Sequence, residues 1–391
     1  MIRLITILGI VIFGAGSFLF VVNKNKPEAR QEPEVVTPIE ISEVPAPPPP
    51  FELSSISEKP KNKEVAKEKI LVQQVTLPFN PETSCSGAIF EKIQCYRGYY
   101  KMLLQRSGAK VAMSDIRSRY SDPFIKSQCH QLAHVVGREA ALFYPNVSEA
   151  FRYGDSFCWS GYYHGVMEGI VGDVGQENLA RKLDSICMDI PGKESFSFDY
   201  YNCVHGLGHG IMGVSNNELF KSLEMCDNLT GGWERSSCWS GAFMENIIAD
   251  EVYHVSKYLS SDPLYPCNAV ADKYKNTCYL MQTSRMLALV NRDFTKVFDL
   301  CGSVEEPYIN TCYQSLGRDA SGNTVSDVEK TRSYCLLGKD LRQRSHCIIG
   351  AIKDFISYHH SDVQARTLCI SLPGELQEVC NNTTDGYYKI F

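Results

Sequence analysis

The sequence predicts an all-α protein, a disulfide-stapled helical-hairpin solenoid of about nine repeats, preceded by a transmembrane helix and a disordered linker. Three observations favour this fold class: sixteen cysteines that recur at a regular interval, apolar residues at helical spacing between them, and one long apolar run at the start of the chain. A chain of 391 residues accommodates such an array as one body. We divide it into an anchor (1–23), a linker (24–81) and a repeat domain (82–391).

The apolar run predicts a membrane anchor. Residues 4–22 follow Arg3 almost without a polar side chain, which is about the length that a helix needs to cross a bilayer core. Since no clear cleavage site of small residues follows the run, we expect an uncleaved signal-anchor, with a cleaved signal peptide as the alternative. All cysteines lie after position 84, and disulfides persist in oxidising compartments. We therefore place the cysteine-rich domain on the extracytoplasmic side, periplasmic or extracellular, of a single-pass protein.

The linker predicted at 24–81 is rich in Pro, Glu, Lys and Val and includes four consecutive prolines, Pro47 to Pro50. No sustained apolar period is visible there. Such a composition is typical of an extended spacer that cannot bury a core, so we expect it to hold the repeat domain away from the membrane.

Cysteine spacing defines the repeat domain. Most cysteines form close pairs along the sequence, and the first members of the last four pairs are 34 residues apart, which is the period of helical-hairpin repeats. We expect each pair to bridge the end of a first helix and the start of a second helix. The pairs are Cys85 with Cys95, Cys187 with Cys203, Cys226 with Cys238, Cys267 with Cys278, Cys301 with Cys312, Cys335 with Cys347, and Cys369 with Cys380.

Apolar spacing around one pair supports the hairpin. Phe294, Val297, Phe298 and Cys301 fall at i, i+3, i+4 and i+7, and the same spacing recurs from Ile309 to Leu316, as on one face of a helix. A single hairpin cannot bury its apolar face alone, and each bridge closing a loop of about ten residues stabilises it by roughly 2 to 3 kcal/mol. The disulfides are therefore expected to be structural.

This pattern resembles the cysteine-rich secreted repeat proteins of the tetratricopeptide-like class. In that class, α-hairpins with internal disulfides stack into a curved solenoid. The resemblance covers residues 82–391 and is one of architecture, because it rests on the cysteine pairs and their 34-residue interval. It implies an all-helical array and no particular activity.

Two cysteines break the pattern, because Cys129 and Cys158 have no partner in their own hairpins. We expect them to bridge each other across neighbouring second helices, and a free or metal-bound pair is the alternative.

Histidines gather in the same irregular stretch. Five of the nine lie between positions 130 and 209, in the strings CHQLAHVVGRE, CWSGYYHGVMEG and CVHGLGHGIMG, each of which we expect to open a second helix. His130 with His134, His205 with His209, and His164 with Glu168 are each four residues apart, which places both members on one helix face. Second helices of stacked hairpins run side by side, so the pairs are expected to converge on one groove.

Paired ligands at i and i+4 are a common way for a helix to bind a metal ion. We predict that His130, His134, His164, His205 and His209 bind a divalent metal, zinc first, with iron or copper as alternatives. The tetrapeptide CWSG recurs at 238–241, where Met244 stands in the place of His164 and Glu245 and Asn246 add oxygen donors. The competing interpretation is that the histidines are satisfied core residues and that the glycines around them allow close helix packing.

Two classes of function follow. In the first, Glu168 or Glu245 acts as a general base beside a metal-bound water and the site is hydrolytic, although the full motifs of hydrolytic zinc enzymes are missing. In the second, the solenoid is a non-enzymatic scaffold that binds a peptide, a glycan or an envelope protein. A net charge of −6 without a long basic run predicts that nucleic acid is not a partner.

Overall fold

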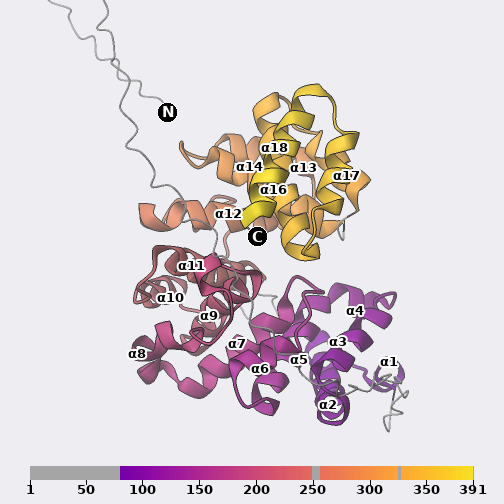
Figure 1. The fold of residues 1–391 in the computed structure, drawn as a ribbon, viewed down its shortest axis with the longest axis vertical. Helices are drawn as coiled ribbons and strands as arrows, with labels where there is room; N and C mark the ends of the chain where they lie inside the picture. Colours follow the sequence, from indigo (N-terminus) through magenta and orange to yellow (C-terminus); the bar gives the residue numbers. More distant parts are fainter. Residues whose placement is uncertain (1–79, 249–255, 325–326, 391) are drawn as a thin grey trace, which may run out of the picture. The chain divides into compact units, whose positions relative to one another are not determined.

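The computed structural model describes residues 80–248, 256–324 and 327–390, and every regular element in these ranges is a helix (Figure 1). The repeat domain begins with α1 (Pro81–Ser84), close to the predicted boundary at 82. Within the described ranges, no helix is both long enough and apolar enough to cross a membrane. Residues 4–22 and the predicted linker up to residue 79 lie outside those ranges, so the anchor and the spacer stay predictions; Pro81, assigned to the linker, is the first residue of α1.

In the described ranges, nine helices, which we call the inner helices, follow one another along the chain. Each packs against the next one along the chain. They are α2 (Ile89–Ser107), α5 (Cys129–Phe143), α7 (Gly161–Val174), α9 (Phe198–Val214), α11 (Gly232–Ile248), α12 (Asp272–Leu289), α14 (Ile309–Asn323), α16 (Leu341–His359) and α18 (Gly374–Ile390). The predicted stacking of second helices in chain order is confirmed.

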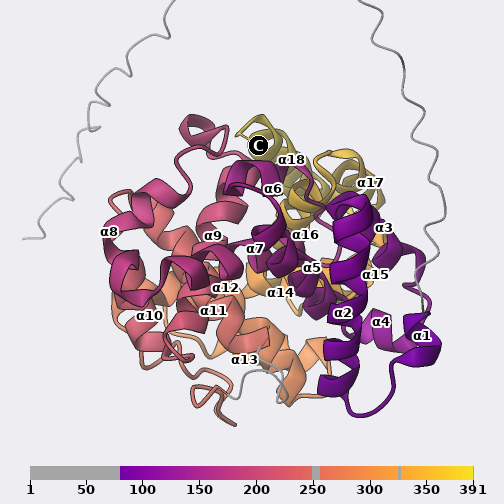
Figure 2. The ribbon, with the colours of Figure 1, turned by 90° about the horizontal axis from the view of Figure 1, so that it is seen from below.

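The helices between them are shorter, and both ribbon views place α8 and α10 at the periphery, outside α7 and α9 (Figure 2). They are α3 (Ala109–Ser118), α4 (Pro123–Ser127), α6 (Val147–Arg152), α8 (Gln176–Ile186), η1 (Lys193–Ser195), α10 (Leu219–Cys226), α13 (Phe294–Gly302), α15 (Val328–Cys335) and α17 (Val363–Ser371). The helical spacing read at 294–301 is confirmed, since Phe294, Val297 and Phe298 are all buried in α13.

One predicted first helix is absent from the described part of its unit. Cys267 lies in a series of turns rather than in a helix. Pro263 and Pro266 precede it, and a proline inside a helix removes a backbone hydrogen bond and clashes with the preceding turn. The hairpin prediction was therefore wrong for residues 256–271.

The seven predicted hairpin disulfides are present, with Cα atoms 5.3 to 5.9 Å apart. The cysteine does not open the inner helix in most of these hairpins, however. For example, α9 begins at Phe198, ahead of Cys203, because the Ser197 hydroxyl accepts a hydrogen bond from the Tyr200 amide and caps the helix. The bridge thus joins the end of a first helix to the second turn of an inner helix.

The two CWSG copies differ in conformation. At the first copy, Cys158, Trp159 and Ser160 have φ values of 61°, 54° and 59°, and α7 starts only at Gly161. The second copy lies inside α11. Cys158 is bonded to Cys129 of the preceding inner helix, as predicted, with Cα atoms 5.5 Å apart. Left-handed backbone is unfavourable for residues other than glycine, so this segment is held by its surroundings.

Candidate metal centre

Five histidines from three consecutive inner helices come together in the interior. His130 and His134 extend from α5, His164 from α7, and His205 and His209 from α9. Their exposed fractions are between 1% and 7%. The predicted convergence is therefore present, but the side chains lie buried between helices and do not line an open groove.

Within each i, i+4 pair the two imidazoles face each other through the same ring nitrogen. The Nε2 atoms of His130 and His134 are 2.9 Å apart, and those of His205 and His209 are 3.2 Å apart. The ring centroids are separated by 4.5 and 5.0 Å. Helical spacing alone accounts for this pairing.

In the first pair, the Nδ1 atoms, which we call the outer nitrogens, each contact a hydrogen-bond acceptor. The His130 Nδ1 lies 2.8 Å from the carbonyl oxygen of Cys158, and the His134 Nδ1 lies 2.6 Å from a carboxylate oxygen of Glu168. Arg138 donates to the other Glu168 oxygen at 2.5 Å. Burial opposes ionisation of Glu168, but His134 and Arg138 outweigh it and hold the pKa of this carboxyl well below its usual value. Since a carbonyl and a carboxylate only accept, both Nδ1 atoms carry the proton.

The second pair repeats this arrangement. The His209 Nδ1 lies 2.6 Å from a Glu245 carboxylate oxygen, and the His205 Nδ1 lies 2.7 Å from the Ser240 hydroxyl. The Ser240 hydroxyl also contacts the carbonyl of Ser237 at 2.7 Å, and the Tyr201 hydroxyl lies 3.2 Å from the same His205 nitrogen. At His130, His134 and His209 the partner only accepts, so a neutral ring carries its proton on Nδ1 and a lone pair on the inward Nε2.

The neutral form is favoured at three of the buried imidazoles. Burial lowers the pKa values of His130, His164 and His205 well below the usual range, and the neighbouring imidazoles lower them further. Protonated rings are therefore disfavoured, and the facing nitrogen lone pairs repel one another unless a cation or a proton lies between them.

His164 lies between the two pairs. Its ring centroid is 5.4 and 5.5 Å from those of His130 and His134, and 4.9 and 4.3 Å from those of His205 and His209. Its buried Nδ1 finds no hydrogen-bond partner among the described residues. A buried polar nitrogen without a partner is costly and points to a ligand that supplies one.

Three overlapping groups of side chains bring their ligand atoms within 4.8 Å of one another. They are His130, His134 and His164; His164, His205 and His209; and His134, Glu168 and His209. The chain matches no protein-family model, no curated protein and no solved structure. The helical hairpins and this cluster thus rest on the structure of the chain itself, and membership of the tetratricopeptide-like class stays a prediction.

Glycines allow the helices of the cluster to approach closely. A Cβ atom on Gly165 would lie 2.1 Å from the His134 carbonyl oxygen, and one on Gly241 would lie 1.9 Å from that of His205. Gly208 faces the Cys238 carbonyl in the same way, at 2.1 Å. The glycines are therefore needed for packing, as the core interpretation expected. That packing also brings the imidazoles together.

The predicted pairing of His164 with Glu168 is not what the structure shows, because Glu168 reaches across to His134 of α5. Asn246 is fully buried, and its Oδ1 accepts a hydrogen bond from Ser256 at 2.5 Å. Met244 is partly buried and packs against the apolar core. The sequence analysis missed Ser240 and Arg138. Ser240 stands 35 residues after His205, and Glu168 34 after His134, so one repeat length was the signal that could have found the outer partners.

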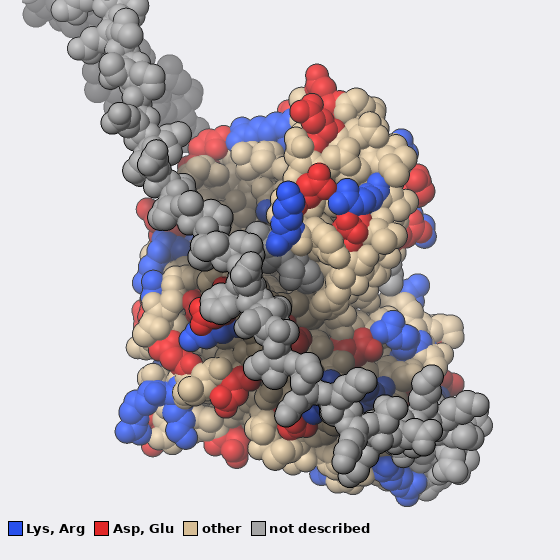
Figure 3. Space-filling view, in the orientation of Figure 1, with Lys and Arg blue, Asp and Glu red and all other residues tan. Residues whose placement is uncertain are grey.

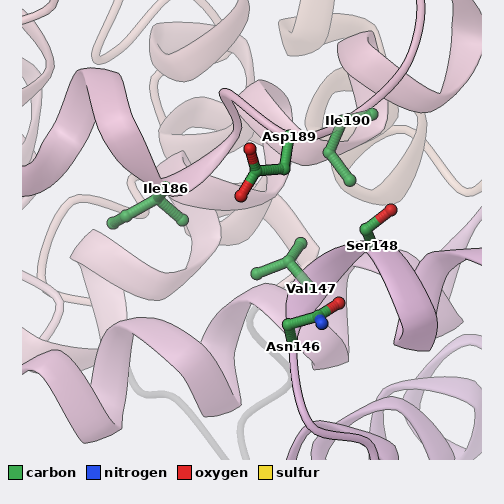
Figure 4. Close-up of a pocket in the computed structure, with 6 residues that line it drawn as sticks. All are labelled: Asn146, Val147, Ser148, Ile186, Asp189 and Ile190. Atoms are coloured by element: carbon green, nitrogen blue, oxygen red, sulfur yellow. The ribbon is translucent and has the colours of Figure 1, made fainter.

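A pocket lies elsewhere on the domain. Figure 4 shows Asn146, Val147 and Ser148 at the start of α6 facing Ile186, Asp189 and Ile190 at the end of α8 and in the turns after it. None of the candidate ligands lines it. A peptide, glycan or envelope-protein partner stays a prediction.

Acidic and basic side chains alternate over the described face in Figure 3. Several form ion pairs, such as Arg117 with Asp155 at 2.9 Å and Lys273 with Asp227 at 2.6 Å. The expectation that nucleic acid is not a partner stays a prediction.

Proposed function

We propose that the helical domain binds a transition metal ion through His130, His134, His164, His205 and His209, with zinc as the first choice and iron or copper as alternatives. The observation that supports this most directly is the facing of the two Nε2 atoms in each i, i+4 pair, with the outer Nδ1 of His130, His134 and His209 engaged by an acceptor. Neutral imidazoles so arranged offer their lone pairs to a cation.

The spacing of the facing nitrogens supports the same conclusion. Two nitrogens bonded to one tetrahedral ion at about 2.05 Å lie roughly 3.3 Å apart. The facing Nε2 atoms are 2.9 Å apart in the first pair and 3.2 Å apart in the second. The second pair is therefore close to this spacing, and the first pair reaches it if its rings separate by a few tenths of an ångström.

The carboxylates fit an orienting role better than that of a general base. Glu168 and Glu245 each bind the Nδ1–H of a histidine, and metal-binding imidazoles commonly donate their second N–H to a carboxylate. Such a partner fixes the ring and makes Nε2 more basic. Glu168 also belongs to one of the three groups and is a candidate ligand.

Burial favours a closed binding site over hydrolysis of a large substrate. Each of the five imidazoles is at most 7% exposed, and closed ligand sets are typical of structural or storage sites, whereas catalytic sites keep an open position. Eight disulfides fit an oxidising compartment. We propose that residues 4–22 attach the protein to a membrane and that the metal centre lies on the extracytoplasmic side.

Metal analysis of the full-length chain in detergent tests the proposal. The protein is equilibrated with Zn²⁺, passed through a desalting column and assayed for bound metal. We expect stoichiometric metal in the wild type, loss of binding after His134→Ala with His209→Ala, and no loss after the control substitution His346→Ala. His346 lies in α16, where it contacts Gln314. Substoichiometric metal in the wild type, or binding that persists after the double substitution in a folded chain, would contradict the proposal.

A further inference from the structure

We propose that the centre holds two metal ions, one at each i, i+4 histidine pair, and that His164 bridges them by giving one ring nitrogen to each. This inference rests on the proposed function, since it specifies the number of ions and the ligand they share.

The five imidazoles do not surround a single point. Among the described residues, His130 shares a 4.8 Å group only with His134 and His164, and His205 shares one only with His164 and His209. Ligand atoms on one ion with bonds of about 2.0 to 2.1 Å lie at most about 4.2 Å apart. One ion therefore cannot bind all five side chains in this arrangement. Of the three groups, the two that contain an i, i+4 histidine pair both include His164.

Each pair is a complete chelating unit with its own outer partners. The pair on α5 is held by the Cys158 carbonyl and Glu168, from the segment that leads into α7 and from α7 itself. The pair on α9 is held by Ser240 and Glu245 of α11. The sequence separations from the second histidine to its carboxylate are 34 and 36 residues. The same two-helix device thus occurs twice in the array.

His164 is common to both groups, and its position fits a shared ligand. It lies between the pairs, and its ring is nearly parallel to that of His209, with an interplanar angle of 15°. Its Nδ1 has no hydrogen-bond partner among the described residues. An ion at one pair supplies the partner that Nδ1 lacks. We assign the other ring nitrogen, Nε2, to the second ion.

Bridging requires that His164 lose its N–H proton. Binding of both ions converts the neutral ring to an imidazolate, and the proton is released to solvent, as is usual when metals replace protons on their ligands. The half-buried Glu168 and the buried Glu245 lie beside the two pairs and would supply negative charge near both ions. Arg138 donates to the outer oxygen of Glu168.

Counting ions in half-site variants tests the number of ions. Full-length protein is loaded with Co²⁺ or Zn²⁺ and compared with His130→Ala/His134→Ala and with His205→Ala/His209→Ala. We expect two ions per chain in the wild type and one in each double variant. One ion in the wild type, abolished by either double substitution, would overturn the two-ion inference and leave the proposed function intact. If the wild type bound no ion, both the two-ion inference and the proposed function would be wrong.

Electron paramagnetic resonance of the Cu²⁺-loaded chain tests the bridge. An imidazolate couples two Cu²⁺ ions, so we expect the signal per copper to fall as wild-type protein goes from one to two equivalents. The variant His164→Ala should show two ordinary, uncoupled signals, and His130→Ala/His134→Ala a single one. Two uncoupled signals in the wild type would overturn the bridge. This result comes from the wild type alone and does not depend on whether any variant folds.

Discussion

The inner helices α5 to α9 and α14 to α16 pack in the same way and yet have different interiors. In both regions a glycine lies against the backbone of the neighbouring inner helix. A Cβ on Gly165 would lie 2.1 Å from the His134 carbonyl oxygen, and one on Gly350 would lie 1.9 Å from that of Gln314. The close approach of inner helices is thus a property of the array and does not by itself create a site.

The residues at equivalent positions make the difference. The sixth residue after the inner-helix cysteine is His209 in α9 and Arg318 in α14. Arg318 donates to Asp319 at 2.9 Å, and Asp319 also accepts from Thr283 at 2.7 Å and from Ser284 at 2.8 Å. These four side chains of α12 and α14 therefore satisfy one another, whereas each inward Nε2 of α5 and α9 faces another Nε2. The same packing of inner helices can therefore enclose either polar side chains that bond one another or a ligand site.

Disulfides give the largest expected difference between the regions. Cys129→Ser/Cys158→Ser opens a bridge with a sequence separation of 29, and Cys301→Ser/Cys312→Ser opens one of 11. Through loop entropy, the first change should lower the free energy of unfolding by about 3.6 kcal/mol and the second by about 2.8 kcal/mol. Only the first should also weaken metal binding, because the Cys158 carbonyl orients His130. Urea unfolding and competition with a chelator measure the two effects, and equal metal affinity in both variants would contradict the comparison.

Glycine substitutions separate packing from metal binding. Gly165→Ala and Gly350→Ala should each cost about 1 to 3 kcal/mol, since the added methyl group pushes against a carbonyl of the neighbouring helix. Gly172→Ala, in α7 with nothing within 4 Å of its Cβ, should stabilise by about 0.8 to 1 kcal/mol. We expect metal affinity to fall for Gly165→Ala alone. Thermal unfolding and metal titration check this. If Gly350→Ala lowered metal affinity as much as Gly165→Ala does, the proposed difference between the two regions would be wrong.

The smallest expected effect is a pH dependence in the second region. Burial raises the pKa of Asp354 in α16 from 3.8 to about 6. Between these values the folded chain keeps a proton that the unfolded chain has lost, so this group lowers stability as the pH rises from about 4 to about 6, with no further change above. Asp354→Asn should therefore be more stable than the wild type by about 1 kcal/mol at pH 7.5 and equal to it below pH 4.

The histidine region should show the opposite trend. The lowered pKa values of His130, His164 and His205 mean that the unfolded chain binds more protons below about pH 6.5. In the presence of a chelator, their contribution to stability is complete above that pH and is lost as the pH falls. Urea unfolding at several pH values measures both trends. Parallel curves for the wild type and Asp354→Asn would contradict the assignment to Asp354.

Much of the array was predictable because its rules are local. A 34-residue cysteine interval and helical apolar spacing are enough to predict stacked hairpins, and a separation of four residues is enough to place His130 beside His134. The errors also have local causes. Ser197 starts α9 ahead of its cysteine, and the prolines before Cys267 replace a helix by turns.

The sequence by itself therefore determined the staples, the stacking order and the paired histidines, since each depends on residues close in the chain. Only the tertiary structure decided that the imidazoles are buried, that Glu168 serves His134 of another helix, and that His164 lies between two pairs. These relations join residues about one repeat apart or more. They depend on how closely neighbouring helices approach, which is a property of the packed array rather than of any single helix.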